Sequence, residues 1–86
     1  MDSASSPDAT CRRYAERARE VRLSIGDLDS EYVLIKGSKL GLQFLGELLL
    51  AQAEANDTGF QISPMGPGEI YFSPGSTRGL YIERTN

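Results

Sequence analysis

The sequence contains no histidine and no tryptophan, and Cys11 is its only cysteine. Without histidine the chain lacks the commonest general base and the commonest transition-metal ligand, which disfavours hydrolytic triads and most metal sites. A single cysteine cannot form an internal disulfide, which fits a reducing compartment. We therefore expect a cytoplasmic protein that is not an enzyme, with no catalytic residue, no metal site and no cofactor.

Long apolar runs are missing as well. No segment approaches the roughly 20 apolar residues of a membrane span, and the N-terminus has neither the basic nor the apolar segment of a signal peptide, so we expect neither export nor a membrane partner. With 86 residues, 40% of them apolar, the chain suffices for one compact core and is too short for two. The prediction is a disordered tail over residues 1–7 and a single domain over 8–86.

Charge is distributed unevenly along the chain. Five of the nine basic residues lie in one short stretch: Arg12, Arg13, Arg17, Arg19 and Arg22. Arginines along a helix could contact phosphates, but Glu16 and Glu20 interrupt the run and the rest of the chain is acidic. A solvated, ion-paired helix is therefore favoured over nucleic-acid binding. The acidic remainder would attract a basic partner.

Two helices are expected. The first begins with Asp8 as its N-cap and continues to Glu20, and its apolar stripe is so narrow that it would pack lightly or stay mobile. The main helix runs from Ser38, a good N-cap, to Ala55, and Asn56 to Gly59 form the turn that ends it. Its apolar face comprises Leu42, Leu45, Leu48, Leu49 and Ala53, and Leu50 lies among the polar positions. Gly41 and Gly46 each cost about 1 kcal/mol in a helix, which indicates close approach to a sheet.

Five strands complete the pattern. Apolar alternation or β-branched and aromatic runs between turn residues predict them at 21–25, 32–35, 60–63, 69–72 and 79–84, with the second more buried than the first. Gly26 and Asp27 would end the first strand. The fold class is therefore α+β, with an antiparallel sheet of about four to five strands, the main helix (about 38–55) packed on one face, and a short N-terminal helix.

Three features could carry chemistry, and each has a simpler explanation that we favour. Cys11 lies among arginines that could lower its pKa and make it reactive, but a partly exposed cysteine without function is the simpler reading. Asp27, Asp29 and Glu31 alternate like calcium ligands, yet they lack the frame of a calcium loop and suit a solvated turn. The glycine-rich stretches 64–68 and 73–79 lack the lysine and helix of a phosphate loop and suit hairpin connections.

Tyrosines beside carboxylates point to a binding surface. Tyr32, Tyr71 and Tyr81 lie on expected strands next to Glu31, Glu69 and Glu83. Such pairs are typical of protein interfaces, although a tyrosine on a half-buried strand usually covers the core. The residues proposed to bind a partner are Glu69, Tyr71, Tyr81 and Glu83.

Three segments carry a resemblance to a known group of proteins: YVLIKGSKLGLQFLGELLLAQAEA, GFQISP and FSPGSTRGLYIER, within about residues 32–84. They resemble small bacterial proteins predicted to be immunity proteins of polymorphic toxin systems. The matching positions are Ile35, Gly37, Gly41-Leu42, Leu45, Pro74-Gly75-Ser76 and Leu80-Tyr81-Ile82. Many members of the group carry a histidine where this chain has Phe60 to Ser63. The resemblance implies a protein that neutralises a toxin by occluding its surface.

Two functions follow as hypotheses. The first is a non-catalytic, intracellular protein-binding domain, of the immunity type, whose partner is another protein such as a basic toxin domain. The alternative is a small structural or regulatory module that self-associates as a homodimer, through an exposed edge strand or through Leu50 and its neighbours. An enzyme or small-ligand carrier would need a motif that the sequence does not contain.

Overall fold

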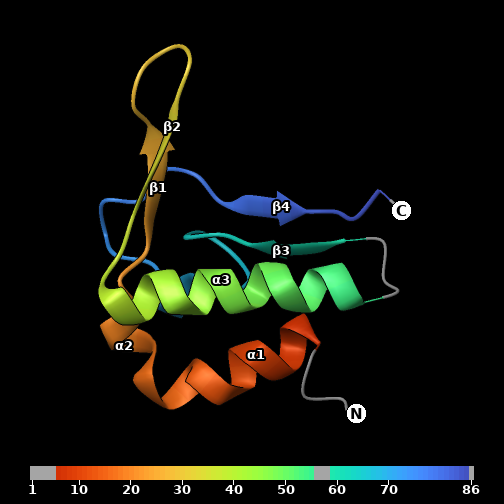
Figure 1. Cartoon of the computed structure of the whole chain (residues 1–86). Helices are drawn as coiled ribbons and strands as arrows, with labels where there is room; N and C mark the ends of the chain where they lie inside the picture. Colours follow the sequence, from red (N-terminus) through yellow and green to blue (C-terminus); the bar gives the residue numbers. More distant parts are fainter. Residues whose placement is uncertain (1–5, 56–58, 86) are drawn as a thin grey trace.

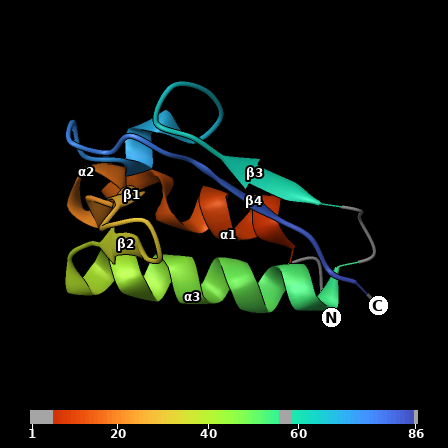
Figure 2. The ribbon, with the colours of Figure 1, turned by 90° about the horizontal axis from the view of Figure 1, so that it is seen from above.

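The computed structural model describes residues 6–55 and 59–85 and confirms the α+β class. Its elements, in chain order, are α1 (Pro7–Tyr14), η2 (Ala15–Arg17), α2 (Ala18–Val21), β1 (Ser24–Asp27), β2 (Val33–Lys36), α3 (Lys39–Glu54), β3 (Phe60–Ile62), η3 (Glu69–Tyr71) and β4 (Leu80–Ile82). Helix α3 packs with α1 along one edge and the β3–β4 pair along the other edge of the same side, and the β1–β2 hairpin projects from the end of the domain near α2 (Figures 1 and 2).

The expected sheet of four to five strands is replaced by two separate antiparallel pairs in the described residues, β1–β2 and β3–β4. The strand predicted at 69–72 is wrong because Gly68, with φ 80°, turns the chain into the 3₁₀-helix η3. Phe72, the next residue, makes an isolated parallel bridge to Leu23. The main helix therefore has no continuous sheet to lie across.

The N-terminal helix starts earlier than expected. Ser6, and not Asp8, is the N-cap of α1, because its Oγ accepts a hydrogen bond from the N–H of Ala9 at 3.0 Å. Pro7 is the first helical residue, where its missing N–H costs nothing. The predicted tail over residues 1–7 thus extends too far, and its first five residues lie outside the described part of the chain.

The N-terminal helix also docks firmly, contrary to the light packing predicted for it. Both Arg13 and Tyr14 donate hydrogen bonds to the carboxylate of Glu47 on α3, at 2.8 and 2.7 Å. On the other side, the Tyr71 hydroxyl donates to the backbone carbonyl of Cys11 at 2.5 Å. These contacts join α1 to both α3 and η3, so the helix is part of the domain.

Helix α3 matches its prediction at both ends. The Oγ of Ser38 accepts the N–H of Gly41 at 2.9 Å, and the helix ends at Glu54; the turn expected over residues 56–58 lies outside the described residues. Gly41 does permit close approach, but to the end of α2 and not to a sheet as predicted, since a Cβ there would overlap the carbonyl oxygen of Val21. Gly46 does not, because a Cβ there would meet nothing within 4 Å.

In the residues that the structure describes, no helix is long and apolar enough to cross a membrane.

The buried face of α3 is rotated from the predicted one. Phe44, Leu45 and Leu48 are buried, whereas Leu42 and Leu49 are half exposed. Seen from above, α1 and the β3–β4 pair lie on the same side of α3, which leaves its other side uncovered by any described element (Figure 2). Leu50 is 71% exposed, as expected for its place among polar positions.

Aromatic rings form the centre of the core. The Phe44 ring stacks on the Tyr71 ring, with centroids 4.5 Å apart, and on its other flank lies the Tyr14 ring at 5.0 Å. Val21 and Leu23 belong to the same cluster and are fully buried. Residues from α1, α2, α3 and η3 thus share one apolar cluster, which positions the base of the β1–β2 hairpin.

The first two strands differ from the sequence prediction in position and burial. Val21, Leu23 and Ile25 are all buried as predicted, but Val21 ends α2 and the strand begins at Ser24 and includes Gly26 and Asp27. The second strand, expected to be more buried, is mostly exposed because the hairpin extends beyond the body of the domain (Figure 1).

Candidate functional site

The projecting hairpin is the candidate functional site. Its second strand exposes 58% of Val33 and 40% of Ile35, and Leu28 and Tyr32 near the tip are also more than half exposed. Four large apolar side chains within eight residues are too many for a surface that contacts only water, since exposed apolar clusters mark interaction surfaces.

One edge of the hairpin is covered by the chain itself. The segment from Tyr71 to Arg78 runs beside β1, with hydrogen bonds from Leu23 N–H to the Tyr71 carbonyl at 2.9 Å and from Thr77 N–H to the Ile25 carbonyl at 3.0 Å. The N–H of Ile25 donates to the Ser76 Oγ at 2.9 Å. The outward N–H and C=O groups of Ile25, in the middle of β1, are therefore satisfied.

The other edge, along β2, is open. Hydrogen-bonded and non-bonded pairs alternate in an antiparallel ladder, and Ile25 directs both of its backbone groups away from β2. Ile35, which pairs with Ile25, is therefore a non-hydrogen-bonded position of β2. Val33, which pairs with Asp27, is the other one. The N–H and C=O groups of Val33 and Ile35 point outward, and no described residue pairs with them.

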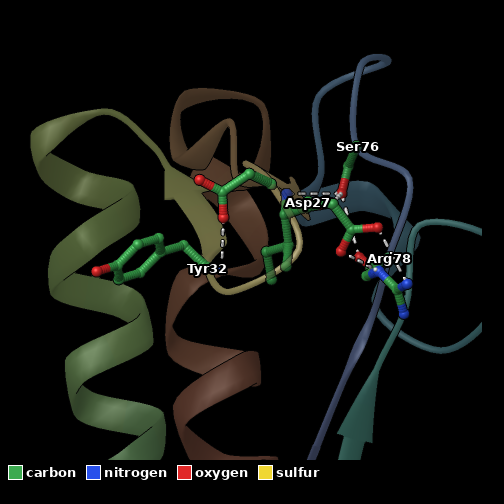
Figure 3. Close-up of polar contacts among 6 residues, drawn as sticks. Asp27, Tyr32, Ser76 and Arg78 are labelled. Atoms are coloured by element: carbon green, nitrogen blue, oxygen red, sulfur yellow. Dashed lines mark hydrogen bonds and ion pairs between the residues drawn. The ribbon is translucent and has the colours of Figure 1, made fainter.

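Polar contacts hold the hairpin in place. The Arg78 guanidinium makes two hydrogen bonds to the Asp27 carboxylate, at 2.8 and 3.1 Å, and Ser76 lies beside this pair, while the Tyr32 ring points away from it (Figure 3). At the tip, the Asp29 Oδ1 accepts the N–H groups of Glu31 and Tyr32, at 2.8 and 3.0 Å. This contact is the solvated acidic turn expected from the sequence.

Two of the three carboxylates of this turn are engaged in protein contacts. Asp27 pairs with Arg78, and Asp29 caps the turn, so neither adopts a ligand arrangement with Glu31. Among residues 6–55 and 59–85, no three side chains of histidine, cysteine, aspartate or glutamate gather as a metal-binding group. The acidic tip presents Asp29 and Glu31 to solvent.

The four residues proposed from the sequence to bind a partner do not share one sheet face. Tyr71 is only 4% exposed and belongs to the core, so its place in an exposed surface is wrong. Glu69 is exposed but lies on η3. Tyr81 and Glu83 are exposed on and just beyond β4, where the Tyr81 ring covers Gly59. These two remain a candidate surface separate from the hairpin.

Cys11 is not activated by its arginine neighbours. Burial, together with the nearby Asp8 carboxylate, raises the pKa of its thiol to about 11, and the opposing effect of Arg12 is smaller. At neutral pH the side chain is therefore a protonated thiol with little nucleophilic character.

Sequence reasoning located the strand at 32–35 but missed its exposure, because an apolar run of four residues fits a buried strand equally well. No signal in the sequence itself distinguishes a buried strand from an exposed one here.

Comparison with protein families, curated proteins and solved structures finds no match for this chain. The geometry of the hairpin is therefore the main indication of its function.

Proposed function

We propose that this protein is a non-catalytic binding domain that takes up an extended segment of another protein along the open edge of β2. The observation that supports this function is the combination of outward backbone groups and exposed apolar side chains at Val33 and Ile35. An added strand would satisfy the backbone groups and cover the side chains in one step.

The charge of the hairpin tip indicates the chemistry of the partner. Asp29 and Glu31 are exposed there, and the whole chain carries a net charge of −3. A segment with lysine or arginine next to apolar residues would complement both the acidic tip and the apolar strand. Opposite charge also accelerates encounter, which suits a protein that must find its partner quickly.

The resemblance to immunity proteins makes a basic toxin domain the first partner to test. In that proposal the hairpin occludes a functional surface of the toxin in the cytoplasm, and no residue of this chain needs to perform chemistry. The binding surface is then β2 and its acidic tip, in place of the sheet face proposed from the sequence.

The expected affinity follows from the backbone groups that the open edge of β2 offers. Four backbone groups, the N–H and C=O of Val33 and of Ile35, each contribute about 0.5–1.5 kcal/mol when paired. Burial of the neighbouring apolar side chains adds to this, and ordering of the peptide opposes it. We expect micromolar affinity for a short peptide and tighter binding for a folded partner.

The experiment is a selection of random linear peptides on the immobilised full chain, followed by affinity measurement for the selected peptides. They should alternate apolar residues and contain lysine or arginine. The variant Val33→Pro removes one outward N–H while leaving the pairing with β1 intact, because proline is tolerated at an outward-facing edge position. It should weaken binding about tenfold, the equivalent of one lost hydrogen bond.

A matched control changes a surface away from the hairpin. Leu50→Lys replaces an exposed leucine on α3 and should leave peptide affinity unchanged. If Val33→Pro binds as tightly as the wild type, or if Leu50→Lys abolishes binding, the peptide does not occupy the β2 edge and the proposal is wrong.

Self-association is the second candidate function, and the uncovered side of α3 favours it. Leu42, Leu49 and Leu50 are all about half exposed or more on this helix. If this surface joins two copies, sedimentation velocity should show a concentration-dependent dimer that Leu50→Lys dissociates and Val33→Pro does not. A dimer dissociated only by Val33→Pro would instead place a second copy on the β2 edge.

A further inference from the structure

A basic hollow lies at the base of the hairpin, where three parts of the chain meet. It has a volume of about 500 Å³ and is lined by Arg22, Lys36, three serines (Ser24, Ser38 and Ser73) and two glycines. No carboxylate is among these residues, although the chain has 12 acidic residues against nine basic ones. The local charge is therefore opposite to that of the whole molecule.

Both cations are available to a ligand. Among the described residues, no carboxylate forms an ion pair with Arg22 or Lys36, whereas Arg13, Arg17 and Arg78 are each paired. The hydroxyls of Ser24 and Ser73 likewise make no hydrogen bond to another described residue, while that of Ser38 is used to cap α3. Two positive charges and two free hydroxyl donors converge on one hollow, which is the donor set of an oxyanion site.

Arg22 has an unusual backbone conformation. Its φ of 53° and ψ of 48° are left-handed, and it is the only residue other than glycine with positive φ in the described chain. Glycine would adopt this conformation at little cost, whereas a residue with a Cβ is strained there. The side chain of an arginine at this position therefore points to a role that glycine could not fulfil.

A second, smaller hollow adjoins the first. It has a volume of about 210 Å³ and shares Arg22 and Ser73 with the larger one. Its remaining lining adds one more cation, Arg19, to an apolar surface made by Ile70, Phe72 and Pro74. A ligand that spans both hollows would place its anionic group against Arg22 and an apolar group against Phe72.

We propose that these joined hollows bind a small organic phosphate, with the phosphate held by Arg22, Lys36 and the hydroxyls of Ser24 and Ser73, and the organic group packed on Ile70 and Phe72. A phosphomonoester carries nearly two negative charges at neutral pH, which matches the two cations. Lys36 lies on the opposite face of β2 from Ile35, because side chains alternate along a strand. The site is therefore independent of protein binding at the open edge.

The test is a titration of the full chain, followed by amide chemical shifts, with phenyl phosphate, inorganic phosphate and phenol in a zwitterionic buffer of low chloride content. Phenyl phosphate should shift the amides of Ser24, Lys36 and Ser73 at millimolar concentration and bind more tightly than either fragment alone. Equal affinity for phenyl phosphate and inorganic phosphate would overturn the assignment of an organic phosphate. No shift at these amides would overturn the site.

Two variants and a control separate the site from general electrostatic attraction. Arg22→Gly and Lys36→Gln should each weaken binding of phenyl phosphate by about tenfold, the effect of losing a charged donor. Arg22→Gly should do so without lowering the melting temperature, since glycine relieves the left-handed strain. Arg12→Gln removes the same charge from an exposed position that lines neither hollow, and should bind normally. Equal weakening in all three variants would refute a specific site.

Discussion

Replacing Gly41 with alanine should destabilise the domain, whereas the same replacement at Gly46 in the same helix should stabilise it. Both glycines cost α3 about 1 kcal/mol relative to alanine, so the gain in helix propensity is the same at both positions. The difference lies in the surroundings: an added methyl group would overlap the Val21 carbonyl oxygen at Gly41 and would meet nothing within 4 Å at Gly46.

The magnitude at Gly41 follows from what the methyl group would displace. The overlapping atom belongs to the backbone, so α2 and α3 must separate, at an overpacking cost of about 1–3 kcal/mol. Separation also weakens the two hydrogen bonds that Ser38 donates to α2, each contributing about 0.5–1.5 kcal/mol. Its N–H donates to the Val21 carbonyl at 3.4 Å, and the single proton of its Oγ is shared between the Glu20 and Val21 carbonyls, at 2.5 and 3.1 Å. After the propensity gain, we expect a net loss on the order of 2 kcal/mol for Gly41→Ala.

Thermal and urea unfolding followed by circular dichroism would measure both variants. For a domain of this size, 1 kcal/mol corresponds to a shift of roughly 4–8 °C in melting temperature. Gly41→Ala should therefore melt at least about 8 °C below the wild type, and Gly46→Ala about 4–8 °C above it. A Gly41→Ala variant as stable as the wild type would refute the close packing of α2 on α3.

Three further predictions concern single side chains. Gln52 is 2% exposed and its amide makes no hydrogen bond to any residue that the structure describes, so Gln52→Met should stabilise the domain by about 1–3 kcal/mol in urea unfolding, whereas Gln43→Met on the exposed side should change little. Hydrogen bonds from Tyr14 and Arg13 lower the pKa of Glu47, so its contribution to stability is present above its unfolded pKa of about 4.3 and is lost as the pH falls through the folded value. Glu47→Gln should therefore lower the melting temperature at pH 7, and this effect should shrink as the pH is lowered below about 4.3; an effect that stays the same across this pH range would contradict this. Because burial raises the pKa of Cys11 to about 11, iodoacetamide at neutral pH should alkylate it far more slowly than a free cysteine.

The elements predicted correctly are those determined by local sequence. Helix α3 has its cap at Ser38 and a long run of helix formers, and neither depends on the rest of the chain. The burial of Leu23 and Ile25 likewise follows from simple alternation. The predicted strand at 69–72 failed because the left-handed turn at Gly68 leads into a 3₁₀-helix, and an apolar run of that length fits either structure.

The candidate sites depended on tertiary placement, which a single sequence does not reveal. Tyr71 was expected on an exposed sheet face, but stacking on Phe44 places it in the core. The strand with Val33 and Ile35 was expected to be more buried than the first strand, but no described element covers the hairpin. The basic hollow has no sequence motif, because Arg22 and Lys36 come together only through the pairing of β1 with β2.

Amide hydrogen exchange of the β1–β2 hairpin, measured with and without a selected basic peptide, would show whether a bound segment pairs with the open edge of β2. In the free protein, the outward N–H groups of Val33 and Ile35 should exchange rapidly and that of Leu34, which faces β1, more slowly. Peptide binding should protect Val33 and Ile35 together, because an added strand pairs with both. If the peptide instead protects amides elsewhere and leaves these two exchanging rapidly, the open edge of β2 is not the binding site.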